Sequence, residues 1–189
     1  RALGITTPIS PYPSSAIGAS AAKPIEMVAA YAAFDNDGSS VSTRFIRRLT
    51  DANGRQLYAE RSAARDSVLD PRVAFIVRDM MRDVVTRGTA TSVRRFLPER
   101  IEAAGKTGTT NDKRDAWFVG FTPKTLVLTL VGFDDNSPVG VSGGKGAAPI
   151  WARYMNCGRA GEPTPPVAPP PATAFATVDG RSGGPGRGT

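Results

Sequence analysis

Histidine is absent from this chain of 189 residues, and cysteine occurs only once. Without an imidazole side chain, the sequence cannot build a Ser-His-Asp or Cys-His catalytic site or a histidine-ligated metal site. Any catalytic base must therefore be a lysine, a carboxylate or a tyrosine, and we predict neither a metal nor a cofactor. The single cysteine, Cys157, cannot form an internal disulfide, so cysteine usage does not indicate the redox compartment.

The sequence also lacks a long hydrophobic run. No segment approaches the ~20 apolar residues of a membrane span, and no signal peptide opens the chain. Because the chain begins at Arg1 and not at methionine, we expect any membrane anchor to belong to sequence upstream of it.

Positive charge is in excess, with a formal net charge of +7 and an isoelectric point near 10.1. Such a balance favours attraction to anionic surfaces. The basic residues are scattered, however, and neither a basic motif interleaved with aromatic residues nor a known nucleic-acid module occurs. We therefore predict no nucleic-acid partner.

Proline and glycine concentrate at the C-terminal end of the chain. From about residue 161 onward these two residues and small side chains dominate the sequence. Such a composition cannot bury enough apolar surface to offset the entropy that is lost on ordering. We predict a folded portion over residues 1–160 and a disordered tail over residues 161–189.

Helical patterns occur in three places. Proline opens the segment 24–34, which is apolar almost all round and is therefore predicted to form a buried helix. Asp70 caps a second segment, in which apolar residues recur at helical spacing until Gly88. A third helix is predicted to begin near Pro149.

Other segments have the composition of strands. Segments 45–49 and 56–59 flank an Asn-Gly turn signal, which predicts a hairpin. Further along the chain, three consecutive antiparallel strands are predicted at 101–109, 117–121 and 126–133. Together the elements predict an α+β fold in which helices pack on an antiparallel sheet.

The first of these three strands carries a recognisable motif. Its residues 104–110 read Ala-Gly-Lys-Thr-Gly-Thr-Thr, and Lys-Thr-Gly is one of three signatures of penicillin-recognising serine enzymes. Thr107 and Thr109 lie on the same face of a strand, and together with the charge of Lys106 they can hold a carboxylate. A well-formed contact of this kind contributes about 1.5–3 kcal/mol. Taken alone, the tripeptide favours the plainer interpretation, an exposed polar strand with incidental glycines.

Two glycine-rich stretches invite comparison with a phosphate-binding loop. Gly105-Lys106-Thr107 has the ending of that signature, but the glycine required five residues earlier is replaced by Arg100. Segment 143–146 reads Gly-Gly-Lys-Gly, but neither Ser nor Thr follows its lysine. We exclude the first as a phosphate loop and interpret the second as a flexible loop.

An ordered series of short blocks resembles the C-terminal part of the transpeptidase domain of class A penicillin-binding proteins. The blocks keep the family's order over nearly all of residues 1–157. They are Gly18, Pro24–Met27, Ala30–Phe34, Asp51, Gly54, Val84-Val85, Gly88–Ala90, Ala104–Asp112, Asp115–Gly120, Thr122-Pro123, Gly143-Gly144 and Ala147–Trp151. The fold that this implies is that of penicillin-binding proteins and serine β-lactamases, incomplete in this chain.

The resemblance implies a bifunctional peptidoglycan synthase that acts on the periplasmic side of the inner membrane of a bacterium. The parent protein would combine a glycosyltransferase with a D,D-transpeptidase. In the transpeptidase a serine attacks a D-Ala-D-Ala stem peptide to form an acyl-enzyme, and the acyl group then passes to an amine. β-Lactams mimic that peptide and trap the serine. The implied partners are stem peptides, β-lactams and other proteins of cell-wall synthesis.

The same resemblance implies roles for residues of the motif strand. Lys106 would support the positive field of the site, the hydroxyls of Thr107 and Thr109 would bind the substrate carboxylate, and the backbone N–H of Thr109 would complete the oxyanion hole. Gly108 and Thr110 complete the predicted substrate-binding segment.

The nucleophile is the point of departure from the family. In the family, the Ser-x-x-Lys and Ser-x-Asn motifs precede the region equivalent to Arg1. Ser-x-Asn occurs nowhere in this sequence. Ser20-Ala21-Ala22-Lys23 spells Ser-x-x-Lys, but the residue before Pro24 is pushed out of the helical region, so Lys23 should not lie one helical turn beyond the serine. We interpret this match as fortuitous.

Three functions remain open from the sequence. The leading one is a transpeptidase whose parent supplies the nucleophile, so that this chain alone is inactive. The second is a non-catalytic module that binds stem peptides or β-lactams. The third is a hydrolase of the D,D-carboxypeptidase or β-lactamase type, which transfers the acyl group to water.

Overall fold

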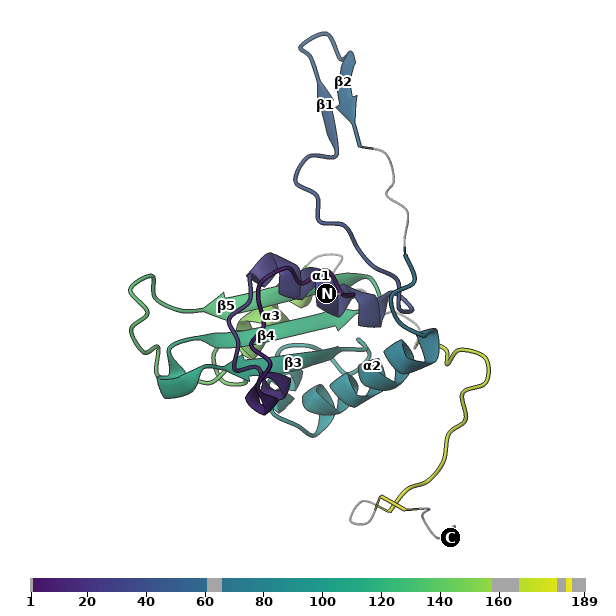
Figure 1. The fold of residues 1–189 in the computed structure, drawn as a ribbon, viewed down its shortest axis with the longest axis vertical. Coiled ribbons are helices and arrows are strands. Elements are labelled where there is room, and N and C mark those ends of the chain that lie inside the picture. The colour runs from purple at the N-terminus through teal and green to yellow at the C-terminus, as the bar shows by residue number, and fades with distance from the viewer. Residues whose placement is uncertain (1, 61–65, 158–166, 180–182, 185–189) are drawn as a thin grey trace.

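The structure, a computed structural model, describes residues 2–60, 66–157, 167–179 and 183–184. The helices in these residues are α1 (Pro24–Asp35), α2 (Pro71–Thr86), α3 (Ala147–Met155) and the short 3-10 helices η1 (Pro13–Ile17), η2 (Thr91–Arg95) and η3 (Asn111–Lys113). The strands are β1 (Arg48–Thr50), β2 (Gln56–Ala59), β3 (Ala104–Thr109), β4 (Ala116–Thr122) and β5 (Thr125–Val131). The predicted α+β fold is confirmed (Figure 1).

The last three strands form an antiparallel sheet in the order β3-β4-β5. Lys106 lies opposite Val119 in its register. The three consecutive strands predicted from the sequence are therefore confirmed. β3 begins at Ala104 and not at residue 101, because the N–H of Ile101 closes a turn onto the carbonyl of Pro98.

Helices cover both faces of this sheet, with α3 on one side and α1 and α2 on the other (Figure 1). The side chains of β4 divide accordingly, because residues three apart on a strand point to opposite faces. Phe118 packs with Trp151 of α3, whereas Phe121 packs with Met81 of α2 and Tyr31 of α1. The sheet that carries the motif strand is thus held from both sides.

Trp151 anchors α3 to the sheet. It is fully buried, its Nε1–H donates to the carbonyl of Gly120 at 3.1 Å, and its ring meets Phe118 edge to face at 5.2 Å between centroids. A Cβ atom at Gly120 would lie 2.6 Å from the indole, so this position requires glycine. The helix begins two residues before Pro149, which the first turn tolerates because its N–H groups have no intrahelical partner.

The first helix, α1, forms where the sequence predicts it, but the prediction that it is buried is wrong. Ala30 and Ala33 are buried, whereas Ile25 is 44% exposed. Apolar residues surround the whole helix, while its main contacts are with α2, β4 and β5. An all-round apolar pattern does not specify how many sides are covered.

The start of α2 and the β1–β2 hairpin follow the local rules that predicted them. The carboxylate of Asp70 caps α2 by accepting the N–H of Arg72 at 2.8 Å. In the hairpin turn, Asp51 accepts the N–H groups of Asn53 and Arg55 at 3.0 and 2.8 Å. Every strand residue of the hairpin is exposed, and the hairpin projects away from the sheet (Figure 1).

Part of the predicted tail lies outside the described residues, namely 161–166, 180–182 and 185–189. Residues 167–179 contain neither a helix nor a named strand, yet they touch the folded body. The N–H of Val167 donates to Glu102 at 3.3 Å, and the rings of Phe175 and Phe75 meet edge to face at 6.4 Å between centroids. Disorder of the tail stays a prediction.

A buried ionic cluster joins α1, α2 and the residues that lead into β3. The side chain of Arg78 is 5% exposed and lies 3.3 Å from Asp35 and 3.4 Å from Glu102. Arg82, which is half-exposed, also contacts Glu102 at 3.6 Å. Burial disfavours the charged form of Asp35 more strongly than the attraction of Arg78 favours it, and the nearby charge of Glu102 adds repulsion. Together these effects raise the pKa of Asp35 to about 7.

The raised pKa of Asp35 makes stability depend on pH. Between its ordinary value of 3.8 and about 7, the folded chain holds a proton that the unfolded chain has lost. This carboxyl group should therefore make the free energy of unfolding decrease as the pH rises through that interval. Urea unfolding across the interval, compared with Asp35→Asn, checks this: the variant should lose this part of the dependence, and identical profiles would contradict it.

Candidate functional site

The motif strand β3 lies at an edge, because β4 pairs with one of its sides and no other strand of the described residues pairs with the opposite side. The N–H of Thr110 points toward β4, where it donates to the carbonyl of Asp115 at 3.1 Å. Since N–H groups of successive strand residues point to alternate sides, that of Thr109 points to the open edge. An extended ligand can pair with backbone groups at this edge.

Lys106 brings a positive charge to the same edge. Its exposed side chain curls so that Nζ donates to the carbonyl of Thr107 at 2.8 Å. The carbonyl of Thr107 belongs to the open edge, because it lies on the same side as the N–H of Thr109. None of the ion pairs found within the described residues involves Lys106, so its ammonium group is available to an anion.

The two threonines of the motif point to the other face of the strand, each toward a different neighbour. The hydroxyl of Thr107 lies 2.7 Å from the hydroxyl of Thr89, in the link between α2 and η2. The hydroxyl of Thr109 accepts the N–H of Gly143 at 3.0 Å. Because a hydroxyl that accepts keeps its own proton, Thr109 can still donate to a ligand.

The glycine segment beside these threonines is tightly packed, and the expectation of a flexible loop is wrong. A Cβ atom at Gly143 would lie 2.2 Å from the carbonyl oxygen of Trp117, and one at Gly144 would lie 2.1 Å from that of Thr89. The hydroxyl of Ser92 also donates to the carbonyl of Gly144 at 2.6 Å. The segment reaches the strand so closely because it has no side chains there.

Thr110, the last residue of the predicted substrate-binding segment, has its hydroxyl engaged in a turn. Its Oγ1 accepts the N–H of Asp115 at 2.7 Å, and the intervening Asp112 and Lys113 both have left-handed backbone, with φ of 58° and 52°. Left-handed backbone at residues other than glycine is costly and persists where the surroundings hold it. Thr110 therefore fixes the turn from β3 to β4.

The structure gives Ser20 and Lys23 different partners. Lys23 has extended backbone, with φ of −69° and ψ of 134°, as the proline rule predicts, and its Nζ lies 3.8 Å from Glu26. The hydroxyl of Ser20 accepts the N–H of Ser10 at 3.3 Å and lies 3.3 Å from the hydroxyl of Ser15. Because Lys23 has extended backbone, it does not lie one helical turn after Ser20, as a working Ser-x-x-Lys motif requires.

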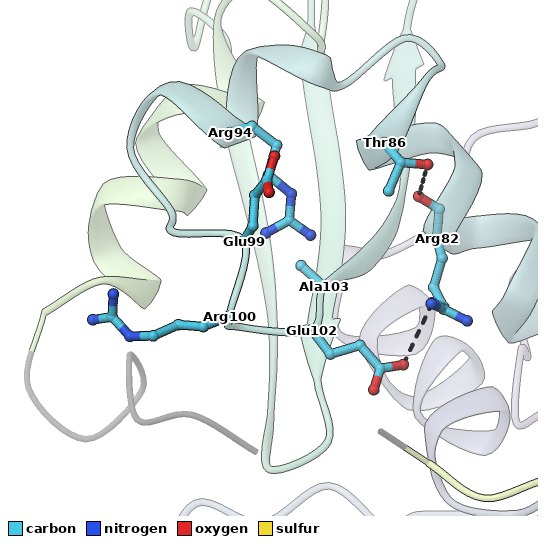
Figure 2. A pocket seen from close by; sticks show the side chains of 7 residues that line it. All are labelled: Arg82, Thr86, Arg94, Glu99, Arg100, Glu102 and Ala103. Carbon is cyan, nitrogen blue, oxygen red and sulfur yellow. Dashed lines mark hydrogen bonds and ion pairs between the residues drawn. The ribbon is translucent and has the colours of Figure 1, made fainter. Parts of the chain in front are cut away.

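A hollow of about 470 Å³ lies at the opposite end of β3, where Ala103 leads into the strand (Figure 2). Its charged lining residues are Arg82, Arg94, Arg100, Glu99 and Glu102. Arg82 and Glu102 pair across it, and none of the residues predicted for the site lines it. Its mixed charges favour neither sign of ligand, so we place the candidate site at the open edge of β3.

Sequence reasoning identified the motif residues but missed Thr89 and Gly143 as members of the site. Both belong to blocks of the family resemblance, which was the one signal available.

No helix in the described ranges is both long and apolar enough to cross a membrane. In the same residues no three acidic or cysteine side chains form a group able to hold a metal ion.

Comparisons with known proteins show which family this chain resembles. The family described as "Penicillin binding protein transpeptidase domain" matches residues 9–156. Penicillin-binding protein 2D of Bacillus subtilis (strain 168) is 36% identical over 195 residues, covering 98% of this chain and 28% of the relative. Penicillin-binding protein 1A of Neisseria lactamica is 39% identical over 158 residues, covering 79% of this chain and 19% of the relative. The chain thus spans less than a third of the length of these relatives.

Solved structures share the fold. The crystal structure of penicillin-binding protein 1A from Haemophilus influenzae matches with a TM-score of 0.86 at 24% identity, covering 98% of this chain and 36% of that one. The penicillin-binding protein PonA1 from Mycobacterium tuberculosis matches with a TM-score of 0.67 at 26% identity, covering 88% of this chain and 49% of that one. With its family match running from residue 9 to residue 156, the chain belongs to the penicillin-binding protein transpeptidase domain family.

Proposed function

We propose that this chain is the C-terminal part of a D,D-transpeptidase domain of a class A penicillin-binding protein, which cross-links peptidoglycan on the periplasmic side of the bacterial inner membrane. The parent would also carry a glycosyltransferase. One observation carries the proposal: a lysine that forms no ion pair within the described residues, two threonine hydroxyls and an outward-facing N–H lie along the open edge of β3. The family match supports it.

The edge can perform the binding half of acyl transfer. The stem peptide lies along β3 with its terminal carboxylate near Lys106, and the hydroxyls of Thr107 and Thr109 donate to that carboxylate. A serine outside this chain attacks the carbonyl carbon of the penultimate D-Ala, and the N–H of Thr109 stabilises the oxygen that becomes negative. The terminal D-Ala departs as the acyl-enzyme forms, and an acceptor amine then attacks the ester and releases the serine.

β-Lactams are expected to use the same contacts, because their carboxylate corresponds to that of the terminal D-Ala. Replacing Lys106 by methionine in the full-length protein should slow acylation by benzylpenicillin about 10- to 100-fold, which corresponds to the about 1.5–3 kcal/mol of a charge-assisted contact. Lys124→Met, in the turn between β4 and β5, removes the same charge away from the edge and should leave the rate within about twofold. Equal rates in both variants would refute the role of Lys106.

Intact-mass analysis separates a half-site from a self-sufficient enzyme. The 189-residue chain incubated with benzylpenicillin should gain no adduct, since the proposed nucleophile lies outside it. The full-length protein should gain one. A stoichiometric adduct on Ser20 of the isolated chain would contradict the interpretation of Ser20 and Lys23 as a fortuitous match.

A further inference from the structure

Thr89 is placed beside the motif strand by a rigid link. Ala90, the next residue, is fully buried, and its N–H donates to the carbonyl of Val84 at 2.9 Å at the end of α2. On the other side, the carbonyl of Thr89 lies against Gly144, where a Cβ atom would come within 2.1 Å. The backbone of Thr89 is thus fixed by α2 and by the glycine segment, and the 2.7 Å contact with Thr107 follows from that placement.

Counting protons shows what the contact can do. A threonine hydroxyl has one proton to donate and two lone pairs to accept. In the pair of Thr89 and Thr107, one hydroxyl donates its proton to the other. Only the accepting hydroxyl then has a proton to donate to a ligand. Thr107 can donate to a carboxylate only when Thr89 is the donor within the pair.

The contact is not needed to satisfy buried groups. The side chain of Thr89 is exposed, and a polar group in water loses little when a partner is removed. Substitutions of exposed surface side chains usually change stability by about 0.5 kcal/mol or less. A role for Thr89 can therefore be measured at the site without unfolding the chain.

We propose that Thr89 is a positioning residue: its hydroxyl donates to Oγ1 of Thr107 and so directs the Thr107 proton toward the carboxylate of the stem peptide or β-lactam. This inference rests on the proposed function, because it concerns the same carboxylate. It assigns carboxylate recognition to two pairs of groups. Thr89 orients Thr107, and the N–H of Gly143 orients Thr109 in the same way, by occupying a lone pair and leaving the proton free.

The test compares acylation of the full-length protein by benzylpenicillin and by its methyl ester, which lacks the negative charge. The quantity of interest is the ratio of the two rates, because it does not depend on the fraction of protein that is active. Thr89→Val keeps the shape of the side chain and removes the donor, and it should lower the ratio about 5- to 10-fold, as expected for the loss of one oriented hydrogen bond. Thr89→Ser retains a hydroxyl and should restore the ratio.

Thr86→Val is the matched control. The hydroxyl of Thr86 is exposed and donates to the carbonyl of Arg82 in its own helix at 3.2 Å, so its removal should leave the ratio unchanged. If the unmodified protein discriminates between acid and ester but Thr89→Val discriminates equally well, the role of Thr89 is overturned and the proposed function stands. If the unmodified protein does not discriminate, both are overturned.

Discussion

Replacing Arg78 by methionine should lower the free energy of unfolding by about 3–5 kcal/mol, because it leaves Asp35 without an ion-pair partner among the described residues, while Glu102 keeps only Arg82. Arg78 is among the most buried charged side chains in the described part of the chain, and it lies between Asp35 of α1 and Glu102. Its guanidinium carbon also lies 6.0 Å from the ring centroid of Phe121. Methionine fills a similar volume, so the loss reports on charge more than on packing.

Arg82→Met is the matched control, since Arg82 is the same residue type one turn further along α2. Its side chain is 47% exposed and bridges Asp79 and Glu102 from the solvent side. Exposed pairs of this kind contribute about 0–1 kcal/mol. Urea unfolding of both variants measures the difference, and equal losses would show that burial does not decide the value of these ion pairs.

The loss in Arg78→Met should also shrink at acidic pH. Without the attraction of the cation, the pKa of Asp35 rises further, and protonation relieves that buried charge. In the unmodified chain the pKa of Asp35 is already raised to about 7. A cost that stays constant from neutral to acidic pH would indicate that packing, not charge, explains it.

Replacing Trp151 by alanine should cost about 3–5 kcal/mol, the range for removing a fully buried aromatic side chain. Trp151 fills the space between α3 and β4, and its Nε1–H is the hydrogen-bond donor to the carbonyl of Gly120. Because Gly120 pairs with Gly105 of the motif strand, the cavity would open directly behind the proposed site. Unfolding in denaturant measures the loss, and acylation by benzylpenicillin in the full-length protein measures its effect on the site.

Two further variants separate packing from hydrogen bonding at this position. Trp151→Phe keeps an aromatic ring and removes only the indole donor, while the carbonyl of Gly120 still faces its register partner Val127 of β5, so the lost hydrogen bond should cost about 0.5–1.5 kcal/mol. Tyr154→Ala, on the exposed side of the same helix, should cost about 0.5 kcal/mol or less. A loss in Tyr154→Ala as large as that in Trp151→Ala would mean that the helix itself, and not the buried indole, was damaged.

Local patterns predicted the elements that local physics governs. Asp70 caps α2 because its carboxylate reaches the N–H of Arg72 two residues away, and the Asn-Gly turn forms the hairpin between β1 and β2 for the same kind of reason. The burial of α1 could not be predicted from its apolar pattern. How many of its sides are covered depends on neighbours that are distant in the sequence.

The sequence by itself determined the elements, the edge-strand motif around Lys106 and the family resemblance, because periodicity, caps, turn residues and short motifs are encoded within a few neighbouring residues. Only the tertiary structure decided which groups support that motif. The Thr89–Thr107 contact joins residues 18 apart and the Gly143–Thr109 contact residues 34 apart, while Arg78 meets Asp35 and Glu102 from separate elements. Such contacts arise when helices and strands pack in three dimensions, so the spacing of residues along one strand does not predict them.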